Sequence, residues 1–283
     1  MADMEVTDRI GAAGPQLTTA ERRVAQVILE LPQLVAFGTV ADLAAQAKAG
    51  AATVVRLAAK LGFDGFSALQ SSVQRDLSRQ LRPAVERIRE LDGHQPLERH
   101  AAVVLSNVQA TLAAVDRATL DKTVELLADL DRPVLVLAGD AERGVALQFV
   151  HDLTGLRADV DPVWGTDVAV RRQLAVSAPQ STLLVLDLRR YERWLLDGVA
   201  VARELGHTVV ALSDGPLSPL AMAAHYSFTL AAQSMSPFES QVGTLALLEL
   251  ITASVAERIR DSAESRLARV DAAWAAGGSL TDG

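Results

Sequence analysis

The sequence predicts an α + α/β protein, in which an all-α domain comes first and a doubly wound domain with a parallel sheet follows. Short amphipathic helices fill the first part of the chain. Further along, apolar runs of strand length at residues 134–139, 182–186 and 208–212 alternate with amphipathic stretches of helix length. Buried strands that alternate with helices form a parallel sheet covered on both faces, with right-handed crossovers.

Length and composition indicate a globular protein of two domains. The chain has 283 residues, of which 49% are hydrophobic, so it can bury a substantial core. Its apolar runs are far shorter than the roughly 20 residues needed to cross a bilayer, and no charged leader precedes them, which predicts a cytoplasmic protein without a membrane partner. The absence of cysteine excludes disulfides, thiolate nucleophiles and cysteine metal sites.

The charge is unevenly distributed along the chain. The net charge is −8, yet residues 43–89 carry eight cations against three anions, a local charge of +5. The cations are Lys48, Arg56, Lys60, Arg75, Arg79, Arg82, Arg87 and Arg89. A basic segment on an acidic protein is typical of a molecule that touches DNA with one domain only. The alternative is a solvated helix surface with no partner.

Three short helices are expected before residue 62. Residues 1–16 have little apolar periodicity and predict a loose leader, in which Gly11, Gly14 and Pro15 occur. Thr18 and Glu21 then form a capping-box pattern at the start of the first helix, which runs to Pro32. A second helix follows Thr39, and a third covers residues 51–61 before Gly62.

The third helix has one apolar and one polar side. Its apolar positions, which face inward, are Val54, Leu57, Ala58 and Leu61. Thr53, Arg56 and Lys60 occupy the opposite side, which predicts a helix that enters the major groove of DNA. Arginines on the first helix are expected to bind phosphates. The candidate DNA-binding residues are Arg22, Arg23, Lys48, Ala52, Thr53, Arg56 and Lys60. A generic helical bundle is the alternative.

These segments resemble a known family. Residues 17–25, 42–44 and 53–66 closely resemble the N-terminal helix-turn-helix domain of the RpiR family of bacterial regulators. The resemblance implies a C-terminal sugar isomerase (SIS) domain, a doubly wound α/β module that binds phosphosugars. The strands and helices expected in the second half of the chain follow the matching order.

The turn before the third helix departs from the family pattern. Where the family has a turn glycine and a capping serine, this sequence has Lys48 and Gly50. Lysine in a left-handed turn is strained by about 1 kcal/mol, whereas glycine is a fair helix cap. We therefore expect Gly50 to take the unusual backbone angle.

Ligands of such sheets bind beyond the carboxyl ends of the strands, here at residues 139–144, 187–192 and 213–218. The family's serines, glycine and threonine in these loops are replaced by charged residues, namely Arg143, Asp187, Arg189, Arg190 and Glu192. Ordinary phosphosugar binding is therefore not inherited. The arginines instead predict a small anionic metabolite, a sugar phosphate or an acidic sugar derivative.

The predicted ligand-binding residues come from all three loops. They are Gly139, Asp140, Arg143, Asp187, Arg189, Arg190, Tyr191, Ser213 and Ser218. Asp140, Asp187 and Glu192 are expected to receive hydroxyls or an amine, and the family also places the Ser213–Ser218 loop beside the site. The alternative is that the charges pair with one another and the domain is a ligand-free dimerisation scaffold.

An enzyme is the main competing interpretation, because SIS domains also occur in sugar-phosphate isomerases. General-base candidates are Glu142, Glu192, Glu239 and His225, but none lies in a distinctive motif. The first loop lacks the middle glycine of a dinucleotide fingerprint, and the five histidines have no ligand-like spacing. We therefore expect neither catalysis, nor a cofactor, nor a metal.

The resemblance divides the chain into four parts: a flexible leader (1–16), a helix-turn-helix DNA-binding domain (17–80), a helical connector (81–125) and an SIS-like sensing and dimerisation domain (126–283). The expected partners are a double-stranded DNA operator and a small anionic effector. A homodimer or homotetramer is expected, since paired helices read repeated half-sites.

Overall fold

The computed structural model describes residues 6–13, 16–80, 85, 88, 97–216 and 218–278. The chain divides into two compact units, residues 1–87 and 88–283. Among the described helices, none is long and apolar enough to cross a bilayer. Gly14 and Pro15 of the predicted leader lie outside the described residues, and so do Pro83, Asp92, Gly93 and Pro96 of the predicted connector, where a bend and a domain linker are expected.

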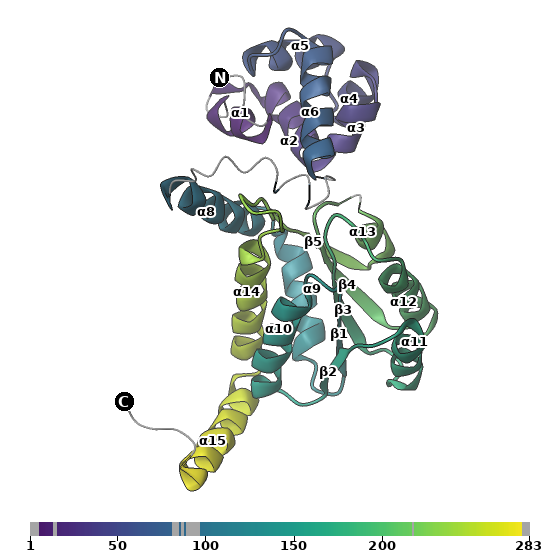
Figure 1. Ribbon diagram of the computed structural model, residues 1–283, viewed down its shortest axis with the longest axis vertical. Coiled ribbons are helices and arrows are strands. Elements are labelled where there is room, and N and C mark those ends of the chain that lie inside the picture. Colours follow the sequence, from purple (N-terminus) through teal and green to yellow (C-terminus); the bar gives the residue numbers. More distant parts are fainter. Residues whose placement is uncertain are drawn as a thin grey trace. The chain divides into compact units, whose positions relative to one another are not determined.

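The regular structure in the described part of the first unit is helical (Figure 1). Its described helices are α1 (Val6–Ala13), α2 (Thr19–Glu30), α3 (Pro32–Phe37), α4 (Val40–Gln46), α5 (Ala51–Lys60) and α6 (Phe66–Gln80). The predicted capping box of Thr18 and Glu21 is confirmed, and Thr39 caps α4 in the same way with Asp42. Gly62, with φ +81°, ends α5 as expected.

Two helices of this unit differ from the predictions. A loose leader was expected over residues 1–16, but α1 lies there, because Val6 and Ile10 share one helical face and are both buried in the core. Pro32 was expected only to end the first helix. It also begins α3, since proline is well tolerated at the first helical position.

The second unit contains a five-stranded parallel sheet in the order β2-β1-β3-β4-β5. The strands are β1 (Val134–Ala138), β2 (Val160–Val163), β3 (Thr182–Leu186), β4 (Thr208–Ser213) and β5 (Tyr226–Thr229). The predicted parallel sheet is therefore confirmed. Sequence reasoning missed β2, because Asp161 and Pro162 interrupt its apolar pattern. An edge strand tolerates both residues.

Helices cover both faces of this sheet, as Figure 1 shows. The first face is covered by α9 (Arg117–Ala128), α10 (Arg143–Leu156) and α14 (Val242–Arg258). The other is covered by α11 (Asp167–Val176), α12 (Arg193–Glu204) and α13 (Pro219–Ala223). Along β1, Val134 and Val136 face the first layer, whereas Leu135 and Leu137 face the second. This alternation gives the sheet two cores.

Two further helices pack around α14. The α8 helix (Leu97–Ala113) meets α14 at Gly243, where a Cβ atom would lie 2.5 Å from Thr111 Oγ1 and 2.6 Å from the Ala231 carbonyl oxygen. The close approach therefore requires glycine. The last helix, α15 (Arg260–Gly277), follows α14 directly. The predicted connector over residues 81–125 includes α8 and most of α9, and both helices pack within the second unit.

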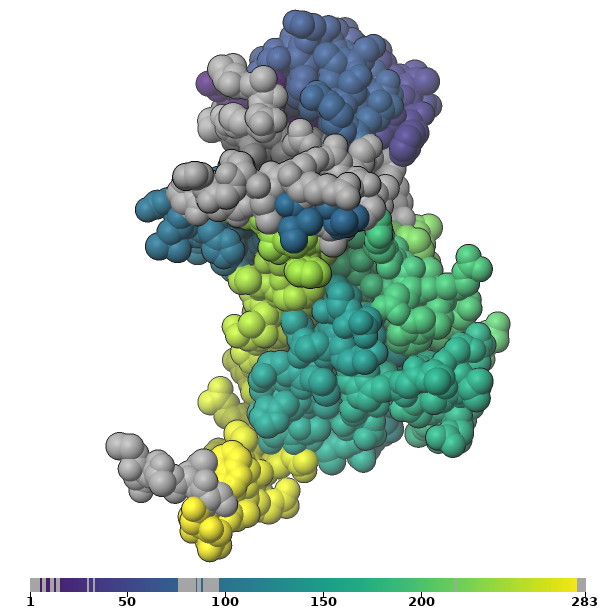
Figure 2. Space-filling model, in the orientation of Figure 1, coloured from purple at the N-terminus to yellow at the C-terminus, as the bar shows by residue number. Residues whose placement is uncertain are grey.

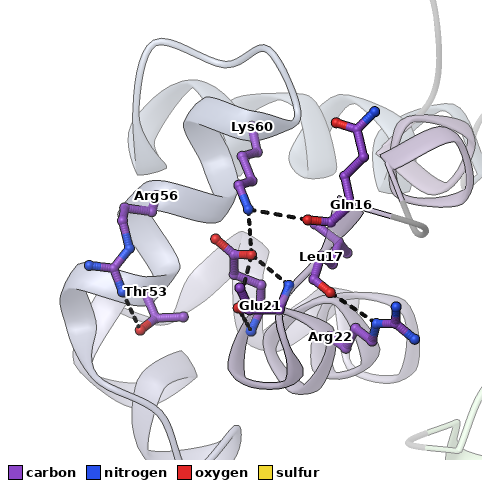
Figure 3. Close-up of polar contacts among 8 residues, drawn as sticks. Gln16, Leu17, Glu21, Arg22, Thr53, Arg56 and Lys60 are labelled. Carbon is purple, nitrogen blue, oxygen red and sulfur yellow. Dashed lines mark hydrogen bonds and ion pairs between the residues drawn. The ribbon is translucent and has the colours of Figure 1, made fainter.

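A buried carboxylate joins the start of α2 to the end of α5 (Figure 3). One oxygen of Glu21 accepts hydrogen bonds from the Thr18 backbone N–H (2.9 Å), the Thr18 hydroxyl (3.0 Å) and Lys60 Nζ (2.7 Å). Only 4% of the Glu21 side chain is exposed. The hydrogen bond from Lys60, followed by that from the Thr18 backbone, lowers the pKa of Glu21 to about 2.

This carboxylate makes the stability of the first unit depend on pH. We expect Glu21→Gln to lower its free energy of unfolding by about 1–3 kcal/mol at neutral pH, because Lys60 loses a charged acceptor. Since the folded pKa is depressed, the contribution is fully present above the ordinary value of 4.5 and is lost as the pH falls through about 2. The difference between wild type and Glu21→Gln should therefore shrink on acidification.

Hydrogen–deuterium exchange of peptides from residues 17–61, measured across a urea series at each pH, gives the required stability. The matched control is Asp64→Asn, which alters an exposed carboxylate of the same unit. A difference between wild type and Glu21→Gln that stays constant down to the acid limit would contradict the prediction.

Candidate nucleic-acid interface and ligand site

Helices α4 and α5, with the turn between them, form a helix-turn-helix that packs on α2. Val54, Leu57 and Ala58 are completely buried and Leu61 is nearly so, which confirms the predicted inner face of α5. The N-terminus of α5 is capped by the backbone of Gly50, with no side-chain hydrogen bond. The opposite face of α5 is accordingly held in a fixed orientation by the core.

The outer face of α5 differs from the prediction at two positions. Thr53 was expected to project outward but is only 7% exposed, and its hydroxyl accepts a hydrogen bond from Arg56 Nη2 at 3.1 Å (Figure 3). Lys60 was also expected to project toward DNA, yet its ammonium is bound to Glu21. The exposed surface of α5 consists of Ala52, Val55, Arg56 and the ion-paired Lys60, with neighbouring alanines. Sequence reasoning did not name Val55 as a DNA contact, although it lies three residues after Ala52 and therefore on the same face of the helix.

The turn is supported by a side chain from α2. Arg23 Nε donates to the Ala47 carbonyl oxygen (3.1 Å), and its Nη2 donates to that of Lys48 (3.0 Å). Gly50 was expected to absorb the unusual backbone angle, which is wrong. Lys48 itself has φ +48°, while Gly50 is extended at φ −83°. The hydrogen bonds from Arg23 help to offset the cost of a left-handed lysine.

The remaining predicted DNA contacts, Arg22 and Lys48, lie on the same unit. Arg22 is exposed on α2, and its Nε donates to the Leu17 carbonyl oxygen at 3.1 Å. Lys48 is also exposed, at the turn. All of the predicted DNA-binding residues except Thr53 are therefore exposed, and four of the exposed ones (Arg22, Arg23, Arg56 and Lys60) also make hydrogen bonds within the unit.

In the second unit, the loops after β1 and β3 meet at the carboxyl edge of the sheet. A Cβ atom on Gly139 would lie 2.6 Å from Asp187 Oδ1 and 3.0 Å from Glu142 Oε2. The Asp140 backbone N–H donates to Glu192 Oε1 at 2.6 Å. Glycine is thus required at position 139, because any side chain there would displace the two carboxylates.

The loop after β4 joins the same edge. The Tyr191 hydroxyl donates to Asp214, which links the second loop to the third. Ser213 and Ser218 are 2.8 Å apart between their hydroxyl oxygens, and Ser218 also caps α13. Burial and the charge of Asp214 raise the pKa of Tyr191, so its proton is retained. The three predicted loops therefore form one continuous surface.

Two carboxyl groups at this edge are almost fully buried. Glu142 is 2% exposed, and Asp187 is 3% exposed. Burial, together with the negative charge of Asp187, raises the pKa of Glu142 to about 7. Burial also raises the pKa of Asp187 to about 6. Gln241 Nε2 donates to Glu142 at 3.3 Å, a contact that sequence reasoning missed because Gln241 lies far away in the sequence.

The three predicted arginines differ in their surroundings. Arg143 lies 3.3 Å from Asp140 and over the ring of Trp164. Arg189, which has φ +59°, forms a 2.5 Å ion pair with Glu239, and both side chains are largely buried. Arg190 is exposed. The pairing of Arg189 with Glu239 was not anticipated, because Glu239 comes from the segment before α14.

Three backbone amides of this edge, those of Asp140, Leu188 and Glu192, are bonded to the protein's own carboxylates. Asp187 accepts hydrogen bonds from the N–H groups of Glu192 (2.8 Å) and Leu188 (3.0 Å). One oxygen of Glu192 accepts a hydrogen bond from the Asp140 backbone N–H, and its other oxygen accepts one from the Trp194 indole N–H. Free amides at helix starts are the groups that wrap a phosphate. In this protein three such amides are already hydrogen-bonded to Asp187 and Glu192.

Comparison with known proteins agrees with this architecture. Residues 4–80 match the family model described as the helix-turn-helix domain of the rpiR family. The chain is 27% identical over 252 residues to the HTH-type transcriptional regulator HexR of Pseudomonas aeruginosa, with 86% of each chain covered.

Solved structures show the same fold. The sugar isomerase domain of an RpiR transcription factor from Sphaerobacter thermophilus is 27% identical, with a TM-score of 0.57, and covers 62% of this chain and 99% of its own. The Vibrio vulnificus NanR protein, complexed with ManNAc-6P, has a TM-score of 0.59 at 19% identity and covers 98% of this chain and all of its own.

In this chain the helix-turn-helix, which matches the family model, precedes the parallel sheet, which matches the sugar isomerase domain. The curated relatives are named as transcriptional regulators. These findings support an RpiR-family transcriptional regulator, in which residues 4–80 match the helix-turn-helix domain of that family and the second unit has the fold of a sugar isomerase (SIS) domain.

Proposed function

We propose that this regulator reads operator DNA with α5 and responds to a small anionic sugar derivative bound at the carboxyl edge of its sheet. The observation that carries the proposal is the exposed face of α5. This helix is anchored by its buried side on α2 and α4, while Arg56 and small apolar side chains face outward. The naming of the relatives as transcriptional regulators supports a role with DNA in the cytoplasm.

Base reading requires both a hydrogen-bonding group and a surface that fits the groove. Arginine donates bidentate hydrogen bonds to guanine, and small apolar side chains contact the methyl group of thymine. Arg56 supplies the first group, and Ala52 and Val55 supply the second. The hydrogen bond from Arg56 to Thr53 orients the guanidinium before DNA arrives. Thr53, Arg23 and Lys60 therefore position the reading surface, whereas Arg22 and Lys48 contact phosphates.

The effector site lies where Arg143, Arg189 and Arg190 surround the three loops. The ManNAc-6P complex of NanR supports a sugar-derived ligand for this type of domain. In our proposal the ligand's anionic group takes the place of Glu239 on Arg189, and its hydroxyls bind Asp140, Tyr191 and the serines of the third loop. An effector acts only if it binds one arrangement of a dimer better than another, so we also propose a two-fold oligomer.

A second function is favoured by one observation. Backbone amides at the carboxyl edge of the sheet are hydrogen-bonded to Asp187 and Glu192, and the largely buried Arg189 is paired with Glu239. A site in which the charges are paired internally needs no ligand. The second candidate is therefore a regulator whose SIS domain is a dimerisation scaffold without an effector.

The DNA contact is tested with Arg56→Ala in the full chain, against a site first selected from random DNA by the wild type. We expect a loss of about 1–3 kcal/mol in binding and a relaxed preference at one base pair, because the bidentate contact is removed. Arg22→Ala should weaken binding to all sequences and reduce the salt dependence by about one counterion. Fluorescence anisotropy at several salt concentrations measures both effects.

The control for these variants is Arg117→Ala, which removes an exposed arginine from α9 of the second unit. It should bind DNA as the wild type does. Equal affinity and unchanged base preference for Arg56→Ala would show that α5 does not read DNA through this residue.

The effector site is tested by calorimetry of the full chain with ManNAc-6P, 6-phosphogluconate and glucuronate. Arg189→Ala should abolish binding of whichever compound binds. Glu239→Gln should tighten it, because the internal competitor for Arg189 loses its charge. Arg171→Ala, which alters a partly exposed arginine paired with Asp167 on α11, is the control. Binding that survives Arg189→Ala would refute the proposed site, and no binding of any anion would favour the scaffold.

A further inference from the structure

The segment that carries Glu239 lies between the end of β5 and the start of α14. It comprises residues 231–241, and we call it the β5–α14 segment. Its C-terminal part is held by the candidate ligand site, because Glu239 pairs with Arg189 at 2.5 Å and Gln241 donates to Glu142 at 3.3 Å. The state of Arg189 therefore determines how this part of the segment is held.

The N-terminal part of the same segment is held by α8. The Asn107 side chain binds the backbone of Gln233 in both directions, since its Nδ2 donates to the carbonyl oxygen (2.7 Å) and its Oδ1 accepts from the N–H (3.1 Å). One turn further along α8, Thr111 Oγ1 accepts from the Ala231 N–H at 2.9 Å. Asn107 and Thr111 are both almost completely buried. These two polar side chains of α8 thus find their hydrogen-bond partners in the segment.

A backbone hydrogen bond joins the two held parts of the segment. The Ser240 N–H donates to the Ala232 carbonyl oxygen at 3.2 Å. Ser240 follows Glu239 directly, and Ala232, which is buried, lies between the two residues that α8 binds. The route from the ion pair to the contacts with α8 therefore consists of that hydrogen bond with a peptide bond on either side.

The contact between α8, this segment and α14 is closely packed. Figures 1 and 2 show α8 beside the first turns of α14. A Cβ atom at Gly243 would lie 2.5 Å from Thr111 Oγ1, 2.6 Å from the Ala231 carbonyl oxygen and 3.3 Å from that of Asn107. The three elements thus meet without room for a methyl group. Groups packed at this density move together, because none of them can shift alone without a clash.

We propose that the β5–α14 segment transmits the occupancy of Arg189 to α8, and that Asn107 and Thr111 are the positioning residues of this coupling. The inference rests on the proposed function in one respect, namely that an anionic effector takes the place of Glu239 on Arg189. The segment, released at that end, then shifts α8 through its hydrogen bonds. Only residues 88–96 separate α8 from the first unit in the sequence, so a shift of α8 moves the point at which the connection to that unit is anchored.

The test needs neither DNA nor an effector. Glu239→Gln in the full chain removes the charge that pairs with Arg189, and hydrogen–deuterium exchange is followed in peptides from residues 231–241 and 97–113. We expect both peptides to exchange about threefold faster or more than in the wild type, because the segment loses the ion pair that holds it. In an Asn107→Leu background, Glu239→Gln should still accelerate exchange of residues 231–241 but should no longer affect residues 97–113.

A second background guards against a folding defect in Asn107→Leu. Thr111→Val removes only the hydrogen bond from Ala231 and keeps the shape of the side chain, and it should also suppress the effect of Glu239→Gln on α8. If Asn107 and Thr111 only stabilise the fold, Glu239→Gln accelerates exchange of α8 by the same factor in every background, since independent effects add.

The matched control is Glu249→Gln, which removes an exposed carboxylate from α14 and should leave exchange of α8 unchanged. Unaltered exchange of residues 97–113 in Glu239→Gln, or equal acceleration in the wild-type, Asn107→Leu and Thr111→Val backgrounds, would overturn the proposal. The effector site is tested separately, by calorimetry. The coupling and the effector site can therefore fail independently of each other.

Discussion

The buried carboxylate of Glu21 is the contact on which the geometry of the first unit depends. It closes the N-terminus of α2 through Thr18 and holds the last residue of α5 through Lys60. Because α5 is short, a fixed point at its end sets the angle at which its exposed face is presented. Arg23 performs the corresponding task at the other end, where it binds the turn before α5. Two of the basic side chains in this unit therefore serve orientation.

At the carboxyl edge of the sheet, the absence of a side chain at Gly139 allows two carboxyl groups to approach the β1 loop. The same edge is tied to α14 by Glu239 and Gln241, which lie just before that helix. The candidate ligand site therefore lies at the start of α14, which is followed directly by α15.

Much of the fold could be predicted from the sequence. The capping box at Thr18, the glycine after α5 and the three apolar runs of the sheet are local patterns, and each is confirmed. Short or weakly apolar elements were missed, namely α1, α3, α11, α13, α15 and β2. In these elements tertiary packing, rather than a strong local pattern, decides the structure.

The candidate sites were predictable only in part. Spacing placed Thr53 outward, but its small side chain folds under Arg56 and is covered. The partners of Lys60 and Arg189 are distant in sequence, so no spacing rule connects them. The exposed side of a helix can be predicted from the spacing of its apolar residues. Which of its polar side chains is already engaged depends on the neighbouring elements.

The positions of the aromatic residues determine which events in this protein are visible by intrinsic fluorescence. All three tryptophans belong to the second unit, and two flank the carboxyl edge, where Trp164 lies under Arg143 and Trp194 donates to Glu192. The helix-turn-helix contains none. Emission from the unlabelled chain thus reports directly on the surroundings of the sheet edge and of α15, while the DNA-reading unit contributes no indole signal.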